Sequence, residues 1–220
     1  MGKVSIDWWT GELRRYGAID VDQYESKLRS FRDNEQKIFE FIAEARAALL
    51  FLRNGIKVGM QDRPDLWLNF NGQLIYAEVK HFNEKETDRN GAKAMAAAPL
   101  EFVKVGNVIE DEGLHGWQQM CATAVKKEPQ YAPGFPNILV FVNHSDSLDF
   151  HLRSAINEFD DAVQTTGASS PLRKLSGMVI LKNYQTVGRN ATNVEFCYTS
   201  YALHAVDPKF VHLMTQGQLA

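Results

Sequence analysis

The apolar residues between Asn34 and Arg53 recur at intervals of three and four, which is typical of a helix with one buried face. Asp33 or Asn34 can cap the start of this helix, and Asn54-Gly55 provides its end. The pattern therefore predicts a long amphipathic helix. The positions on its buried face are Ile38, Phe41, Ile42, Ala45, Ala48, Leu49 and Leu52.

The pattern then becomes strand-like. Residues Ile56–Met60 predict a short strand, and two further apolar runs follow at Leu66–Phe70 and Gln73–Lys80. These two runs are separated only by Asn71-Gly72, and two strands joined by Asn-Gly are the strongest local signal for a β-hairpin. We expect a two-residue turn with the strands paired directly across it.

The rest of the chain adds further strands and helices. The pattern breaks down over 83–116, and loops of this length are usually functional or disordered, so we expect a mobile or functional insertion. The order of elements predicts an α/β fold with a central mixed β-sheet flanked by helices. The expected later elements are helices at 117–127 and 150–163 and strands at 137–142, 175–181 and 194–203.

A length of 220 residues suits a single domain. We expect one domain over 1–220, with 1–32 as an N-terminal helical extension in which Gly11 and Gly17 are breaks. No apolar run approaches the roughly 20 residues that span a bilayer. The first residues also lack the apolar stretch of a signal peptide, so a cytoplasmic protein without a membrane segment is expected.

Composition constrains the chemistry. The two cysteines, Cys121 and Cys197, are far apart and have no zinc spacing, which favours reduced thiols. The net charge is -3, whereas a protein that coats nucleic acid by charge alone is usually basic. An enzyme acting on nucleic acid remains compatible with this charge, because a local basic patch and a bound metal can suffice.

An acid followed two residues later by lysine is a short pattern, and it occurs four times in the chain. Glu78 and Lys80 stand out because they end a strand, where alternate residues point to the same face. Two of the other copies fall in helical segments, where such residues diverge. The remaining copies are Glu25/Lys27, Glu35/Lys37 and Asp207/Lys209.

The hairpin adds a second carboxylate to this position. With Asn71-Gly72 as the turn, Asp65 faces Glu78, and directly opposed side chains lie about 4.5–5.5 Å apart at Cβ. Two opposed carboxylates repel each other unless a cation lies between them. Glu44, at the flank of the buried helix face, can join them, and oxygen ligands with a neighbouring lysine suit Mg²⁺ or Mn²⁺ hydrolytic chemistry.

The segment from the Glu44 helix through Pro64-Asp65 to Glu78-Val79-Lys80 resembles the PD-(D/E)xK nuclease superfamily, over about 34–82. This resemblance implies a restriction-endonuclease-like or Holliday junction resolvase-like fold and metal-dependent hydrolysis of DNA. It implies Glu44, Asp65 and Glu78 as metal ligands, the Val79 carbonyl as another, and Lys80 as the catalytic lysine.

Many members of that superfamily place a polar residue on the next core helix, and here Gln118 fits better than Gln119, because it flanks the apolar face. The pairs Lys126-Lys127 and Arg173-Lys174 are candidate phosphate contacts, although exposed lysine pairs are more often solvated surface. His81 and His144 follow strands close to the expected site, but core or surface roles are more common for such histidines.

These observations lead to one principal hypothesis, a Mg²⁺- or Mn²⁺-dependent DNA endonuclease with nucleic acid as its partner. A homodimer is a further expectation, because many such nucleases pair to cut both strands. Two alternatives remain open. One is a nuclease-like fold that binds nucleic acid or assembles without cutting, and the other is an RNA nuclease or an effector of antiviral defence.

Overall fold

The computed structural model describes residues 5–82, 116–143, 151–186 and 189–215, with the side chains of 82, 143 and 182–193 excepted. The predicted insertion at 83–116 lies almost wholly outside these residues, as does His144. The described strands form one mixed sheet in the order β1-β2-β3-β4-β5-β6. They are β1 (Lys57–Met60), β2 (Leu66–Phe70), β3 (Gln73–Phe82), β4 (Asn137–Asn143), β5 (Leu175–Thr186) and β6 (Arg189–Tyr198).

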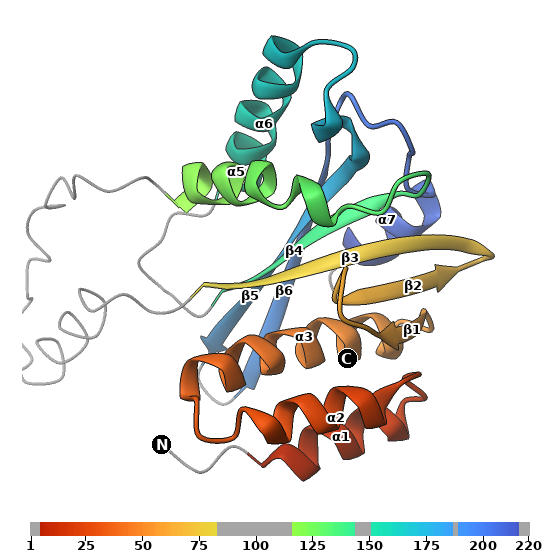
Figure 1. Ribbon diagram of the computed structural model, residues 1–220, viewed down its shortest axis with the longest axis vertical. Coiled ribbons are helices and arrows are strands. Elements are labelled where there is room, and N and C mark those ends of the chain that lie inside the picture. Colours follow the sequence, from red (N-terminus) through yellow and green to blue (C-terminus); the bar gives the residue numbers. More distant parts are fainter. Residues whose placement is uncertain (1–4, 83–115, 144–150, 187–188, 216–220) are drawn as a thin grey trace, which may run out of the picture.

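The predicted α/β class with a mixed sheet is confirmed. Strands β3, β4 and β5 run parallel to one another. The pairs β1–β2, β2–β3 and β5–β6 are antiparallel. The α-helices of the described residues lie on both faces of this sheet (Figure 1). They are α1 (Ile6–Arg15), α2 (Val21–Ser30), α3 (Glu35–Arg53), α5 (Gly116–Lys126), α6 (Leu152–Thr166) and α7 (Pro208–Thr215).

The long predicted helix is α3. Of the two candidate caps, Asn34 is the N-cap residue, and its side chain accepts a hydrogen bond from the Lys37 N–H. Gly17 separates α1 from α2 with a positive φ of 81°. Gly11 lies inside α1, so the prediction of a break there is wrong. A single glycine costs a helix only about 1 kcal/mol, which packing of the apolar face can outweigh.

The register predicted for the hairpin is confirmed. Phe70 pairs with Gln73 across the turn, and Leu66 pairs with Ala77 at the other end of β2. Both turn residues have positive φ, 51° for Asn71 and 86° for Gly72. This combination defines the type I′ turn that matches the twist of the two strands.

Toward the C-terminus, the observed elements differ more from those that the sequence predicts. The last strand was expected over 194–203, but β6 spans Arg189–Tyr198 and the chain then turns. No helix was expected after it, yet α7 follows and buries Phe210 and Met214. Among the described residues, every helix is too short or too polar to cross a lipid bilayer.

Two cores lie on opposite faces of the sheet. On one face, α3 and α7 pack against alternate residues of the strands, with α1 and α2 outside α3 (Figure 1). On the other face, α5 and α6 cover a second core that contains Leu139 and Phe141 of β4. The N-terminal helices contribute Leu13, Tyr24 and Leu28 to the first core, so they pack against the rest of that core.

Candidate active site

The site lies at the N-terminal end of β2, where β3 continues beyond its pairing with β2. Beyond the last ladder pair, Leu66 and Ala77, the next residues are Asp65 and Glu78. The carboxylate of Asp65 turns back, and its Oδ2 accepts a hydrogen bond of 2.7 Å from the Val79 N–H. The Asp65 side chain thus accepts the Val79 N–H at a point where β2 offers no backbone carbonyl to pair with it. This hydrogen bond holds Asp65 beside β3.

Glu78 and Lys80 share the face of the sheet that α5 and α6 cover. They lie beside Leu139 and Phe141 of the parallel strand β4, and both of these belong to the core on that face. Neighbouring residues on adjacent strands point the same way. The alternation predicted for Glu78 and Lys80 therefore leads both side chains toward α5.

The Glu78 side chain is only 3% exposed, and two lysines contact a single one of its oxygens. Oε1 lies 3.1 Å from Nζ of Lys80 and 2.8 Å from Nζ of Lys127, which follows directly after α5. Its other oxygen, Oε2, is buried and has no hydrogen-bond partner among the described residues. A buried carboxylate oxygen without a hydrogen-bond partner is costly for a fold.

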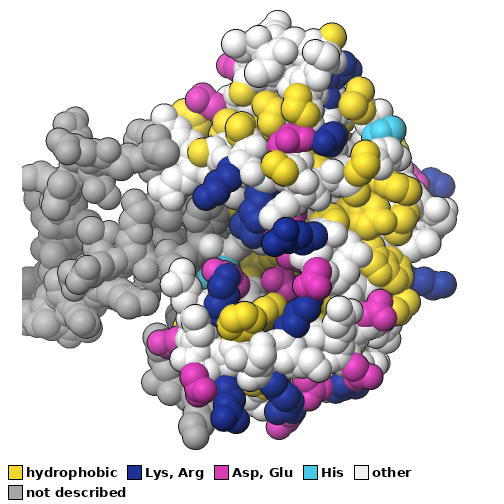
Figure 2. All heavy atoms as spheres, in the orientation of Figure 1, with side chains coloured by type: hydrophobic (Ala, Val, Ile, Leu, Met, Phe, Trp, Pro, Cys, Tyr) yellow, Lys and Arg dark blue, Asp and Glu magenta, His cyan; other side chains and the backbone are white. Residues whose placement is uncertain are grey.

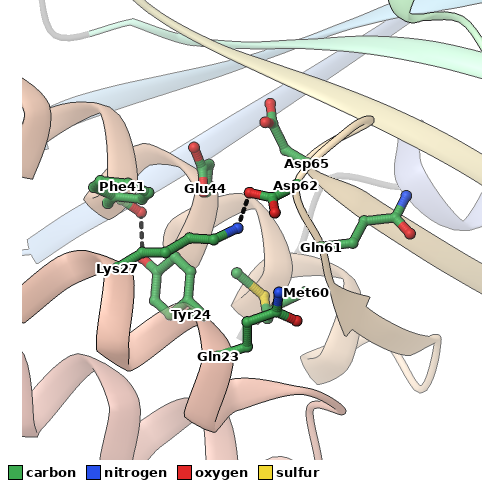
Figure 3. Close-up of a pocket in the computed structure, with 9 residues that line it drawn as sticks. All are labelled: Gln23, Tyr24, Lys27, Phe41, Glu44, Met60, Gln61, Asp62 and Asp65. Atoms are coloured by element: carbon green, nitrogen blue, oxygen red, sulfur yellow. Dashed lines mark hydrogen bonds and ion pairs between the residues drawn. The ribbon is translucent and has the colours of Figure 1, made fainter.

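Glu44 approaches from the other face, because α3 packs against the core opposite α5. It lines a small pocket together with Asp65, and Figure 3 shows both carboxylates on the same side of that pocket. Burial and the negative charge of Asp65 raise the pKa of Glu44 well above its ordinary value, and Glu78 adds to the effect. Glu44, Asp65 and Glu78 thus form one electrostatic group at the N-terminal end of β2, with side chains that come from both faces of the sheet.

The pocket has a volume of about 40 Å³, which is enough for one or more water molecules. Helix α2 forms one wall, where the Tyr24 hydroxyl donates a 2.5 Å hydrogen bond to the Phe41 carbonyl. Lys27, also on α2, makes an ion pair with Asp62 beside the two carboxylates (Figure 3). Sequence patterns did not identify these α2 side chains, because their approach depends on how α2 packs against α3.

The charges of the site perturb one another. Burial and Glu78 raise the pKa of Asp65 from 3.8 to about 6, although the Val79 N–H acts in the opposite direction. Burial lowers the pKa of Lys80, but the charges of Glu78 and Asp65 more than offset this, so the pKa of Lys80 is raised. Burial is also the main reason that the pKa of Lys127 is lowered.

Two further candidates, Gln118 and His81, are half-buried. Gln118 is half-buried on α5, whereas the α5-side residue that contacts Glu78 is Lys127. His81 follows Lys80 on β3 and stacks on Phe39, with ring centroids 6.1 Å apart. Burial and the charge of Arg46 lower the pKa of His81, which favours its neutral form.

The expectation that Lys127 belongs to solvated surface is wrong, because its side chain is 19% exposed and contacts Glu78. In the sequence, the feature that indicated Lys127 was the pair Lys126-Lys127, a candidate phosphate contact.

The donor set suits a cation that prefers oxygen ligands. Among the described residues, no group of three or more His, Cys, Asp or Glu side chains could hold a metal ion by itself. Mg²⁺, however, usually takes only one or two carboxylates and completes its shell with water and substrate phosphate. Asp65 and Glu78, whose charges act on each other, are the two carboxylates that could serve such an ion, and Oε2 of Glu78 has no other partner among the described residues.

The surface around the site is hollowed. Figure 2 shows acidic side chains within a hollow on this face, with Lys and Arg side chains gathered around it. A negative floor with a positive rim can hold a cation below and an anionic ligand above. The chain matches no protein-family model, no curated protein and no solved structure.

Proposed function

We propose that the protein is a Mg²⁺- or Mn²⁺-dependent endonuclease that hydrolyses phosphodiester bonds in DNA. The observation that carries the proposal is the buried, unpartnered Oε2 of Glu78, a carboxylate whose other oxygen contacts Lys80 and whose charge acts on Asp65. The mixed sheet flanked by helices is compatible with a restriction-endonuclease-like fold. The order of Glu44, Asp65, Glu78 and Lys80 is what the resemblance to the PD-(D/E)xK superfamily requires.

Each residue then has a distinct task. Asp65 and Glu78 would hold the metal ion together with the Val79 carbonyl. Glu44 would add negative charge beside them, since the three carboxylates do not form a metal-holding group among the described residues. A bound divalent ion supplies an acidified water and stabilises charge that develops on phosphate. Lys80, with a side chain 29% exposed, can reach the surface and donate a hydrogen bond to a phosphate oxygen or to the attacking water.

The electrostatics support this division of tasks. Asp65 and Glu44 are held in surroundings that penalise their negative charge, as the raised pKa of each carboxyl indicates. A divalent cation would remove that penalty by placing positive charge between the carboxylates. Binding of the metal should therefore be coupled to loss of protons from these two carboxyls.

A nicking assay tests the proposal. Supercoiled plasmid is incubated with the protein and Mg²⁺ or Mn²⁺, and an Asp65→Ala variant and a Lys80→Met variant are compared with the wild type. Asp161→Ala, an exposed residue of α6, is the matched control. We expect wild type and Asp161→Ala to nick at equal rates and the two site variants to lose activity by about 100-fold or more. Equal trace rates for wild type and Asp65→Ala would refute the endonuclease.

One observation favours a second candidate, a protein that binds nucleic acid without cutting it. Two lysines already neutralise Glu78 on one oxygen, as in a site that selects anions and not cations. Titration with Mn²⁺ separates the candidates, because the endonuclease requires saturable binding that Asp65→Ala weakens. Absence of binding at millimolar Mn²⁺ favours the non-cleaving protein, and a parallel assay with structured RNA tests the RNA alternative.

A further inference from the structure

Lys127 is the least expected member of the site, and its position is fixed from several sides. Its Nζ contacts Oε1 of Glu78 at 2.8 Å and donates to Oε1 of Gln130 at 2.7 Å. Its backbone N–H is bound by the Thr123 carbonyl at the end of α5. The buried Tyr131 hydroxyl donates to the Ala124 carbonyl and so holds the following turn against α5.

The ammonium of Lys127 is not fully used by these contacts. A lysine ammonium carries three N–H donors, and Glu78 and Gln130 account for two of them. The side chain is 19% exposed, so part of it reaches the surface. A charged donor that is partly exposed is suited to an anionic oxygen.

The charge balance on this side of Glu78 points the same way. Lys80 and Lys127 both lie against the same carboxylate oxygen of Glu78, so their two ammonium groups are held close together. Like charges at such a distance repel each other. An anionic oxygen bound to both ammonium groups would relieve that repulsion on the α5 side of Glu78.

We propose that Lys127, together with Lys80, forms a phosphate-binding site that holds the nucleic-acid backbone on the α5 side of Glu78. This inference rests on the proposed function for its class of ligand, but it requires neither metal nor cleavage. The competing explanation is that Lys127 serves only to neutralise the buried Glu78. The two explanations differ in what happens when the charge of Glu78 is removed.

Binding of a fluorescein-labelled DNA duplex in EDTA, followed by anisotropy at several salt concentrations, tests the proposal. We expect Lys127→Met to weaken binding about tenfold at low salt and to reduce the salt dependence by about one ion. Lys126→Met is the matched control, because Lys126 is the preceding residue and is exposed. It should bind within about twofold of wild type, and Lys127→Arg should retain most of the affinity.

A second pair of variants keeps the test decisive if Lys127→Met alone is unstable. Glu78→Gln removes the buried charge, so Lys127 is no longer needed as its counterion. We expect Glu78→Gln/Lys127→Met to bind the duplex about tenfold more weakly than Glu78→Gln. Equal affinities for these two proteins, or an equal loss in Lys126→Met, would overturn the proposal. Since EDTA prevents cleavage, a failed nicking assay bears on the endonuclease and not on this site.

Discussion

Replacement of Asp65 by asparagine should stabilise the metal-free protein at neutral pH. The pKa of Asp65 rises from 3.8 to about 6 in the folded chain, mainly through burial and the charge of Glu78. One pKa unit corresponds to about 1.4 kcal/mol, so the ionised carboxylate costs the fold on the order of 2–3 kcal/mol. The asparagine amide oxygen can still accept the hydrogen bond from Val79, while the charge is removed.

The pH dependence has a definite sign. Between pH 3.8 and about 6 the folded state binds the Asp65 proton and the unfolded state releases it. The stability that this proton provides is complete below the lower value and is lost as pH rises through the higher one. The difference between wild type and Asp65→Asn should therefore be small near pH 4 and reach its full size above about pH 7.

Urea unfolding in EDTA at several pH values measures this difference. Asp62→Asn serves as the control, because Asp62 lies in the same loop but is 66% exposed. Its replacement should change the free energy of unfolding by less than about 1 kcal/mol. An Asp65→Asn protein that is less stable than wild type at pH 7.5, or a difference that does not vary with pH, would refute the reasoning.

Three further substitutions test the local structure. Gly59→Ala should destabilise the protein by about 1–3 kcal/mol in urea unfolding, because a Cβ there overlaps the Trp67 indole. Gly11→Ala should instead raise the melting temperature, since its Cβ meets nothing within 4 Å and glycine disfavours a helix by about 0.5–1 kcal/mol. Asn34→Ala should cost about 1 kcal/mol by the same unfolding measurement, as it loses the cap to the Lys37 N–H, and Asn34→Asp should not.

The hairpin could be predicted in detail because its determinants are adjacent in sequence. Asn71 and Gly72 both adopt the positive φ that a two-residue turn needs, and this turn fixes every pair of the ladder. The approach of Asp65 to the position of Glu78 follows from that register. Strand alternation then adds Lys80, so three of the site residues depend on local pattern alone.

The remaining members of the site depend on packing between distant segments. Lys127 reaches Glu78 because β4 pairs parallel to β3 and α5 crosses that face. Lys27 reaches the pocket because α2 packs outside α3 and beside the loop before β2. Periodicity reveals which face of a helix is buried, but it contains no information about which partner covers that face.

Glu78 lowers the stability of the fold and is also the central residue of the proposed site. A buried carboxylate costs several kcal/mol unless charges and hydrogen bonds compensate it, and an apolar residue of similar size would avoid the cost. The chain compensates only one oxygen, using Lys80 and Lys127, and leaves Oε2 without a partner. Local rules of folding are typically broken in this way where a site serves a ligand. Under the proposed function this ligand is a cation at Oε2, because the lysines already occupy the other oxygen and an anion would be repelled from the free one.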